Sequence, residues 1–522
     1  FVYHLKKNRM LPAIYFKFSR VQCEICAREI IANFVTHEER KEIDLIFRNR
    51  LSKYKQYYGH LQQYHDVYNQ LLKGVVYHHS GLIPILKEII EILYAKGLIK
   101  LLFATETFAV GVNMPAKAVI FNDLKKYDNY GLRYLRTDEY LQMSGRAGRR
   151  GLDKHGTVII LPTMDLPNYA TLKGIMSGRS PSIKSKFIPS YQFILKALHN
   201  NELSIDKFID TTLFSKENTG TIAQTKRKLD SLGDVDETEY NSLNEMEVDE
   251  IIKYIKMEDR VNNTVIRLNN KDRKKTIKNM KKIGNRDYFK TVYSVIKKIN
   301  KEYELRDELQ RKIDYQKSFV LEDVQKIITI LKDGYLNEEN KLTEKGLIAI
   351  EINDCNPLIF TELIYKRYLE DCKFEDIIAI LAVFIDEKSR DNHFVSIKEL
   401  PKRIPDIVID LLYYLGDEYN YMLKLEEGTR LNIPMKNDYE LKLDFIVPAY
   451  MWAKGCTINE IYEQTDIYEG NFVRGILRIN RMVENIINVA ENLKYYKLQK
   501  ILEEYEEKLI RDVVTINSLY IS

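Results

Sequence analysis

The sequence contains no run of about 18 or more apolar residues, although 45% of its residues are hydrophobic. A membrane-spanning helix needs such a run, so we expect no membrane segment and no membrane partner. The chain also lacks a secretory signal peptide, and it begins with Phe1 instead of Met. We therefore expect a processed, trimmed or partial chain. Its 522 residues predict about three or four domains.

Cysteine is scarce, with 5 residues in the whole chain. An odd and sparse set predicts reduced thiols in an intracellular protein, without indicating the nucleus or the cytoplasm. Cys23 and Cys26 have the spacing of half a zinc site, but no second pair of Cys or His follows at zinc-site spacing. We expect these two thiols to lie on a helix, and we predict no metal site.

Neither sign of charge dominates, because 80 basic residues face 75 acidic residues and the net charge is +5. This balance is too mild to indicate nucleic-acid binding, so local clusters must carry that argument. The densest cluster is a basic run from Lys271 to Lys282. It predicts either a helix that contacts phosphates or a solvated helix face, since acidic residues flank it.

The first 166 residues alternate short apolar runs with amphipathic stretches. We expect strands at 13–18, 75–77, 99–104, 118–121 and 157–161. Helices are expected from Val21 and across 84–96. This alternation predicts a parallel α/β sheet, in which ligands meet the loops at the carboxyl ends of the strands. Beyond Pro162 helical patterns predominate, and the last long one spans about 469–495.

The most specific pattern is Gln142-Met143-Ser144-Gly145-Arg146-Ala147-Gly148-Arg149-Arg150-Gly151. At i, i+4 and i+7, we expect Gln142, Arg146 and Arg149 to share one helical face. Gly145 and Gly148 would let another backbone approach closely. Guanidinium groups bind phosphate oxygens in a planar, bidentate geometry and stabilise charge on a transferring γ-phosphoryl group. The pattern therefore predicts arginine fingers, with Arg146 and Arg149 as the catalytic residues.

This segment resembles motif six of the superfamily-two helicases. That family's motif five is resembled by Thr105-Glu106-Thr107-Phe108-Ala109-Val110-Gly111-Val112-Asn113-Met114-Pro115. The family's His-His-Gly-Gly-Leu element, which precedes motif five, is resembled by His78-His79-Ser80-Gly81-Leu82. Residues 11–20 resemble motif four. Together they resemble the second RecA-like domain of the superkiller and exosome-associated DExH-box RNA helicases.

The resemblance implies a set of site residues. The nucleotide-binding residues would be Gln142, Arg146, Arg149, Gly111 and Asn113. Motif five would also contact the RNA backbone through Thr105 and Thr107. ATP and Mg²⁺ are the implied cofactors. The chain has neither a G-x-x-x-x-G-K-[ST] loop nor Asp-Glu-x-His, so the Mg²⁺ ligands are expected in a first motor domain and the chain is expected to be inactive alone.

Residues 352–384 and 449–520 resemble the C-terminal helical region of the same family. The segment from Asp466 to Arg478 resembles the start of its ratchet helix, which lies across the exit of the RNA channel. Arg474 and Arg478 are four residues apart and share a helical face, from which they could stack on or pair with single-stranded RNA. The alternative is two solvated arginines on the surface of a helical bundle.

The implied fold is an α/β RecA-like domain with a parallel sheet, followed by a winged-helix module with a helical insertion and an all-α helical bundle. We expect the RecA-like domain at 1–166 and the first winged-helix part at 167–217. A charged helical insertion, a reduced arch or stalk, is expected at 218–317. The second winged-helix part is expected at 318–352, and the bundle with the ratchet helix at 353–522.

The implied function is that of the C-terminal part of an ATP-dependent 3′-to-5′ RNA helicase in RNA processing or decay. The expected partners are single-stranded or 3′-tailed RNA, a first RecA-like domain in cis or in trans, and the RNA-decay machinery. Two alternatives remain open. One is an RNA-binding subunit without its own ATPase, and the other is a related DNA repair helicase.

Overall fold

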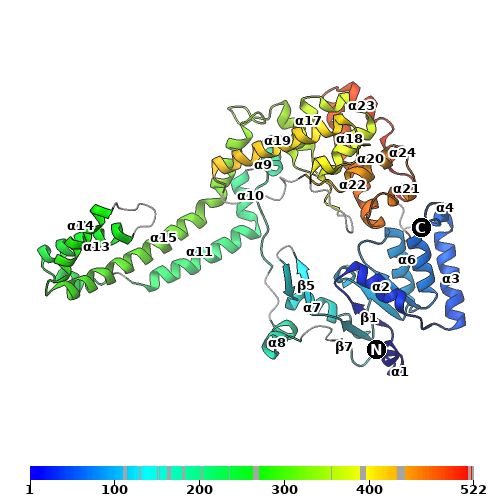
Figure 1. Ribbon diagram of the computed structural model, residues 1–522, viewed down its shortest axis with the longest axis horizontal. Helices are drawn as coiled ribbons and strands as arrows, with labels where there is room; N and C mark the ends of the chain where they lie inside the picture. The colour runs from blue at the N-terminus through cyan, green and yellow to red at the C-terminus, as the bar shows by residue number, and fades with distance from the viewer. Residues whose placement is uncertain are drawn as a thin grey trace. The chain divides into compact units, whose positions relative to one another are not determined.

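The computed structural model describes residues 1–109, 114–128, 131–149, 151, 153–161, 166–178, 183–200, 204–233, 235–262, 270–353, 355–387, 396–431, 441–514 and 519. Gly111 and Asn113, two of the predicted nucleotide-binding residues, lie outside them. The chain divides into two compact units (Figure 1). The first unit comprises 1–183, 330–429 and 434–522, and the second comprises 184–329 and 430–433.

A five-stranded parallel sheet organises the N-terminal part of the first unit, in the order β2-β3-β1-β4-β7. The strands are β1 (Ala13–Phe16), β2 (Val75–His78), β3 (Leu101–Ala104), β4 (Ala118–Phe121) and β7 (Thr157–Ile160). The first four are buried along their whole length, which explains their near-continuous apolar sequences. The predicted parallel α/β sheet and its five strands are confirmed.

The strand register defines two edges of this sheet. Phe16 pairs with Ala104 and Phe121, and His78 pairs with Ala104. The last residues of neighbouring strands are thus paired with one another, so the loops after β1, β2 and β3 begin at the same edge of the sheet, the carboxyl edge. At the opposite, amino edge, Ala116 precedes β4 and forms an isolated parallel bridge with Ala147.

Helices surround the sheet and supply most of its apolar cover. They are α1 (Val2–Lys7), α2 (Arg20–Glu29), α3 (His37–Leu51), η1 (Ser52–Tyr54), α4 (Lys55–Tyr58), α5 (Gln62–Leu71), α6 (Pro84–Ala95), η2 (Glu106–Ala109), α7 (Thr137–Ser144) and α8 (Tyr169–Ser177). Cys23 and Cys26 lie on α2 as predicted, and burial raises the pKa of the Cys23 thiol. Two polar strands that the sequence did not predict, β5 (Lys125–Asp128) and β6 (Gly131–Tyr134), pair antiparallel.

The C-terminal part of the first unit is helical. Its elements are α16 (Glu344–Glu351), α17 (Pro357–Tyr365), η3 (Tyr368–Asp371), α18 (Phe374–Leu381), η4 (Ala382–Phe384), η5 (Ile397–Glu399), α19 (Asp406–Thr429), α20 (Ile446–Ala453), α21 (Ile458–Tyr462), α22 (Glu469–Asn492), α23 (Tyr496–Leu502) and α24 (Tyr505–Leu509). The long helix predicted near 469–495 is confirmed as α22. Across the described residues, no helix combines the length and the apolarity that crossing a membrane requires.

Trp452 on α20 lies in the core of this helical part and is the single tryptophan of the sequence. Its indole N–H donates to the carbonyl oxygen of Leu509 at 2.9 Å. The Arg511 guanidinium lies 3.6 Å from the ring centroid, and Phe472 of α22 meets the ring edge-to-face. The tryptophan therefore ties α20, α22 and the end of α24 together.

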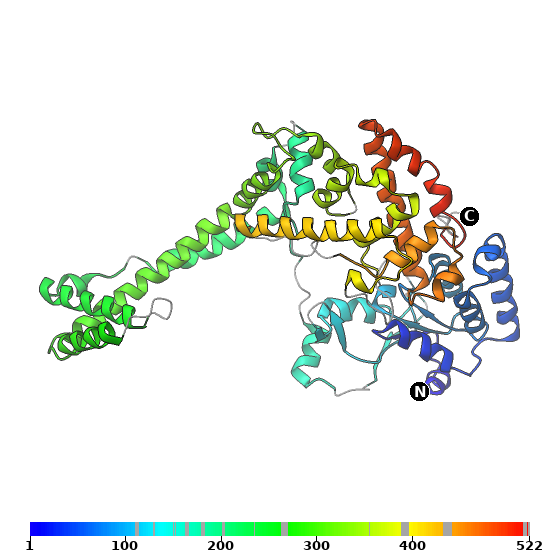
Figure 2. The same cartoon turned by 45° about the horizontal axis from the view of Figure 1, so that its top comes forward.

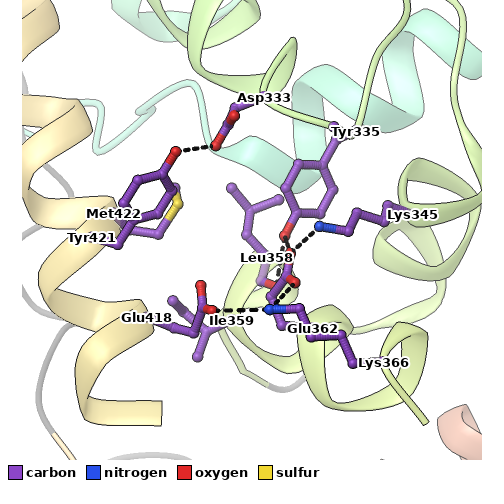
Figure 3. A pocket seen from close by; sticks show the side chains of 11 residues that line it. Asp333, Tyr335, Lys345, Leu358, Ile359, Glu362, Lys366, Glu418, Tyr421 and Met422 are labelled. Atoms are coloured by element: carbon purple, nitrogen blue, oxygen red, sulfur yellow. Dashed lines mark hydrogen bonds and ion pairs between the residues drawn. The ribbon is translucent and has the colours of Figure 1, made fainter. Parts of the chain in front are cut away.

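A pocket of about 390 Å³ lies between α16, α17 and α19 (Figure 3). One of its lining groups is the buried carboxylate of Glu362, which accepts hydrogen bonds from the Tyr335 hydroxyl at 2.8 Å and from Lys345 Nζ at 2.6 Å. Lys366 Nζ lies 3.5 Å from the second carboxylate oxygen and 3.4 Å from Glu418. Two lysines thus accompany the Glu362 carboxylate, and pairing of this kind is how a buried carboxylate is normally tolerated.

The second unit is helical. Its elements are α9 (Tyr191–His199), α10 (Ile205–Thr211), α11 (Leu213–Ser231), α12 (Thr238–Asn241), α13 (Glu245–Asn262), α14 (Asn270–Gly284) and most of α15 (Phe289–Leu331). Figures 1 and 2 show α11 and α15 side by side, and the Asn218 side chain donates to the carbonyl oxygen of Gln316. Val248, Ile251, Val292 and Ile296 form a separate small core. The winged-helix parts and the expected domain boundaries stay a prediction.

Removal of residues 222–312 is expected to leave the rest of the chain folded. The small core around Ile251 lies wholly within the deleted stretch. Because α11 and α15 run in opposite directions and touch at Asn218 and Gln316, residues 221 and 313 lie opposite each other and a short Gly-Ser linker can join them. Thermal unfolding followed by circular dichroism should keep a cooperative transition. A broad, non-cooperative melt of the deletion variant would contradict this expectation.

Candidate functional site

The motif-six segment leaves its helix earlier than the sequence pattern predicted. Gln142 lies exposed on α7, but this helix ends at Ser144, and Arg146 and Arg149 follow it. The prediction that the three side chains share one helical face is therefore wrong. The reason is a tertiary pairing: the Ala116 N–H donates to the Arg146 carbonyl at 2.8 Å, and the Gly148 N–H donates to the Ala116 carbonyl at 2.7 Å.

Gly148 confirms the predicted close approach of another backbone. Its φ is 94°, a left-handed value that favours glycine. A Cβ at this position would lie 3.1 Å from the Cα of Gly156, just before β7. The segment that carries Arg146 and Arg149 is therefore fixed between Ala116 and Gly156, at the amino edge of the sheet.

Arg146 connects the motif-six segment to the motif-five segment. Its Nη2 donates to the carbonyl oxygen of Ala109, the last residue of η2. This short helix follows Thr105, which comes directly after β3 and is buried. The hydroxyls of Thr105 and Thr107 lie 2.9 Å apart, with Thr107 exposed at the carboxyl edge. The guanidinium is thus in direct contact with the turn that carries both predicted threonines.

Arg149 is engaged by a carboxylate that the sequence reasoning missed. Its Nε donates to Oδ2 of Asp153 at 2.8 Å, and its Nη2 donates to Oδ1 at 3.0 Å. Asp153 lies four residues further on, but that spacing signals a pair only inside a helix, and neither Arg149 nor Asp153 lies in a helix. The hydrogen bonds from Arg149 hold the pKa of Asp153 at about 2, well below its ordinary value.

The end of β2 and the loop after it carry the paired histidines, His78 and His79, at the carboxyl edge. His79 is fully buried, with Nε2 3.1 Å from a carboxylate oxygen of Glu24, and its Nδ1 accepts from the Gly81 N–H at 3.1 Å. Burial lowers the pKa of His79. His78 Nε2 lies 3.0 Å from Glu91. Both rings therefore shape the loop through carboxylate partners.

Helix α22 begins against this loop. The Gly470 N–H donates to the Gly81 carbonyl at 3.0 Å. A Cβ on Gly470 would collide with the carbonyl oxygen of Leu82, so the contact depends on glycine. This contact places the predicted ratchet helix beside the carboxyl edge of the sheet.

The two predicted arginines of α22 have different surroundings. Arg474 donates to the Ser80 carbonyl at 2.5 Å and to Asn471 Oδ1 at 2.8 Å, and it pairs with Glu387 at 3.2 Å. Arg478 is half-buried and has no hydrogen-bond or ion-pair partner within the part of the chain that the structure describes. Arg474 therefore serves as a tether to the β2 loop in this structure, whereas the Arg478 guanidinium is available to a ligand. Glu387 could not be found from the sequence, because 87 positions separate it from Arg474.

Comparison with known proteins finds two domain families that match segments of the first unit. Residues 26–151 match the helicase conserved C-terminal domain, and residues 339–517 match the DSHCT (NUC185) domain.

Three curated relatives illustrate the similarity. The chain is 25% identical to the DExH-box ATP-dependent RNA helicase DExH9 of Arabidopsis thaliana, over 98% of this chain and 68% of that protein. It is 26% identical to the antiviral helicase SKI2 of Saccharomyces cerevisiae, over 100% of this chain and 52% of the relative. A segment that covers 45% of this chain is 38% identical to human superkiller complex protein 2, over 19% of that protein. The chain thus spans between about half and two thirds of the relatives that it matches along its whole length.

Proposed function

Because the chain carries these two domains and matches the C-terminal portion of the superkiller-type DExH-box RNA helicases, we propose that it is the C-terminal part of an ATP-dependent RNA helicase. It would drive 3′-to-5′ unwinding or translocation of RNA in processing or decay. The observation that supports this proposal most directly is the Arg146–Ala109 contact. It joins a segment suited to phosphates at one edge of the sheet to the threonine turn at the other edge.

On the nucleotide side, the proposal assigns Gln142, Arg146 and Arg149 to ATP, together with Gly111 and Asn113. Guanidinium groups suit the oxygens of a triphosphate, and their charge is most useful where negative charge develops during phosphoryl transfer. Mg²⁺, when bound, neutralises charge on the phosphates. The sequence has no Asp-Glu-x-His, so we place the Mg²⁺ ligands in a first motor domain.

On the RNA side, the proposal assigns Thr105 and Thr107 to the backbone of the strand and Arg478 to stacking or phosphate contact. All lie toward the carboxyl edge or on α22, which begins against that edge. Arg474 contributes by fixing α22 to the loop after β2. The partners that we propose are single-stranded or 3′-tailed RNA, a first RecA-like domain and the RNA-decay machinery, in an intracellular compartment.

The chain alone is expected to show only background ATP hydrolysis, because its sequence has no phosphate-binding loop and no Asp-Glu-x-His. Addition of the first RecA-like domain, fused or in trans, should produce turnover that single-stranded RNA stimulates. The measurement is steady-state ATPase with saturating poly-uridine RNA, with poly-deoxythymidine as the matched control.

The outcomes of this assay separate the three candidate functions. RNA-stimulated turnover of the joined enzyme supports the helicase. Equal or stronger stimulation by DNA would favour the DNA repair helicase. If the joined enzyme bound RNA but did not hydrolyse ATP, the result would favour the third candidate, an RNA-binding subunit without its own ATPase. Robust turnover by the chain alone would overturn the placement of the ATP phosphates in another domain.

A further inference from the structure

Arg149 and Asp153 form a closed ring of contacts. The side chains share two hydrogen bonds, of 2.8 Å and 3.0 Å. The Arg149 N–H also donates to Asp153 Oδ2 at 3.0 Å, and the Asp153 N–H donates to the Arg149 carbonyl at 2.9 Å. Between them Gly151 has a φ of 80°, a left-handed value that favours glycine. The carboxylate therefore fixes both the backbone and the side chain of Arg149.

The pairing uses only one edge of the guanidinium. Asp153 accepts from Nε and Nη2, so the edge formed by Nη1 and the second hydrogen of Nη2 remains. Nη1 has no hydrogen-bond partner among the residues that the structure describes. The Arg149 side chain is 28% exposed, whereas that of Asp153 is 10% exposed. Asp153 is thus more buried than the guanidinium that it binds, and the edge left over has the hydrogens to bind two oxygens of a phosphate.

The surroundings keep this pair ionised. The guanidinium is the largest cause of the low pKa of Asp153, and Lys117 lowers it further. The pKa of Arg149 is raised, chiefly by its hydrogen bonds to Asp153. A carboxyl group with a depressed pKa keeps its full stabilising contribution above its ordinary pKa and loses it as the pH falls towards the depressed value, here about 2. The pair therefore persists throughout the pH range of an enzyme assay.

We propose that Asp153 is a positioning residue, which orients the Arg149 guanidinium so that its open edge meets the γ-phosphate of ATP. This inference rests on the proposed function of Arg149 as an arginine finger. A finger acts only when its fork is held in place, and misplacement by about 1 Å can cost about 10²-fold in rate. The opposing possibility is that Asp153 sequesters Arg149, in which case its removal would release the finger.

The test compares Asp153→Asn and Asp153→Glu in the chain joined to its first motor domain. Asparagine keeps the shape but loses the charge and one of the two acceptor oxygens. We expect kcat for RNA-stimulated ATP hydrolysis to fall about 10²-fold, with the KM for ATP and the affinity for RNA unchanged. Glutamate restores a bidentate carboxylate and should recover part of the rate.

Asp138→Asn is the matched control, because Asp138 also binds an arginine of this domain through both oxygens, Arg136 at 3.1 Å and 3.3 Å. It should leave kcat unchanged. A merely structural role for Asp153 would lower the melting temperature and RNA affinity together with kcat, and that result would overturn the inference.

The results also separate this inference from the function on which it rests. If the unmodified joined enzyme showed no RNA-stimulated turnover, the proposed function itself would fail. If that enzyme were active and Asp153→Asn equally active, only the positioning role would fail. A rise in turnover on Asp153→Asn would overturn positioning in favour of sequestration.

Discussion

Arg149→Lys, in the chain joined to its first motor domain, is expected to reduce RNA-stimulated ATP turnover on the order of 10³-fold. Lysine keeps the positive charge but loses the planar fork, so it cannot bind Asp153 through two nitrogens and offer a second edge to phosphate. Since the lost interaction would form mostly in the transition state, kcat should fall and the KM for ATP should change little. Steady-state kinetics over a range of ATP concentrations measures both.

RNA affinity without nucleotide should be unchanged in Arg149→Lys, because this residue lies near the amino edge of the sheet. Arg136→Lys, on the same domain and also paired with an aspartate, is the control and should keep full turnover. Arg478→Ala should show the opposite pattern. Its free energy of RNA binding should weaken by about 1–3 kcal/mol, the cost of a lost stacking contact, while ATP turnover per bound complex persists. Weakened RNA binding with normal turnover in Arg149→Lys would show that motif six does not serve ATP.

Glu362→Ala is expected to destabilise the first unit by about 3 kcal/mol, at the low end of the cost of breaking a buried ion pair. The substitution leaves the ammonium of Lys345, only 19% exposed, without its carboxylate. The effect stays at the low end because Lys366 is 38% exposed and retains Glu418, and because the Tyr335 hydroxyl can donate to the Leu358 carbonyl instead. The midpoint of urea unfolding, followed by circular dichroism, should fall accordingly.

Two further variants calibrate this result. Glu362→Gln keeps an acceptor for Tyr335 but removes the charge, and it should lie between the alanine variant and the unmodified chain. Glu339→Ala breaks an ion pair with Lys341 in which both side chains are largely exposed, so it should change the free energy of unfolding by less than about 1 kcal/mol. Equal unfolding midpoints for Glu362→Ala and Glu339→Ala would show that the pocket charges are already solvated.

The parts of the fold that were predictable are those whose cause is local. The strands at Ala13–Phe16 and Leu101–Ala104 are continuous apolar runs because both faces are buried, and α22 repeats apolar residues at helical spacing. The polar strands Lys125–Asp128 and Gly131–Tyr134 contain no continuous apolar run, so the sequence did not predict them. The spacing of apolar residues in a sequence reflects which residues are buried, so it does not reveal a strand that stays at the surface.

The candidate site divides in the same way. Gln142, Arg146 and Arg149 were identified from their types and spacing, and the motif-five residues from the resemblance to a helicase family. Their arrangement depends on contacts with distant segments. The end of α7 is decided by hydrogen bonds to Ala116, and the surroundings of Arg474 are decided by Glu387 and by the carbonyl of Ser80. A helical projection of Arg146 and Arg149 contains none of these partners, which is why it predicted a shared face that does not exist.

Trp452 gives this chain an optical reporter of a single region. With one tryptophan in the sequence, emission under selective excitation comes only from the core between α20, α22 and α24. The indole is fully buried, its N–H is bound to Leu509 and its face is covered by Arg511, so solvent cannot relax the excited dipole while this core is intact. The emission should be blue-shifted in the folded chain and move to longer wavelengths when this core opens. Tryptophan emission does not report the melting of the Ile251 core, which lies in the second unit. If the fluorescence and circular-dichroism transitions failed to coincide, the two units would be seen to unfold separately in one experiment.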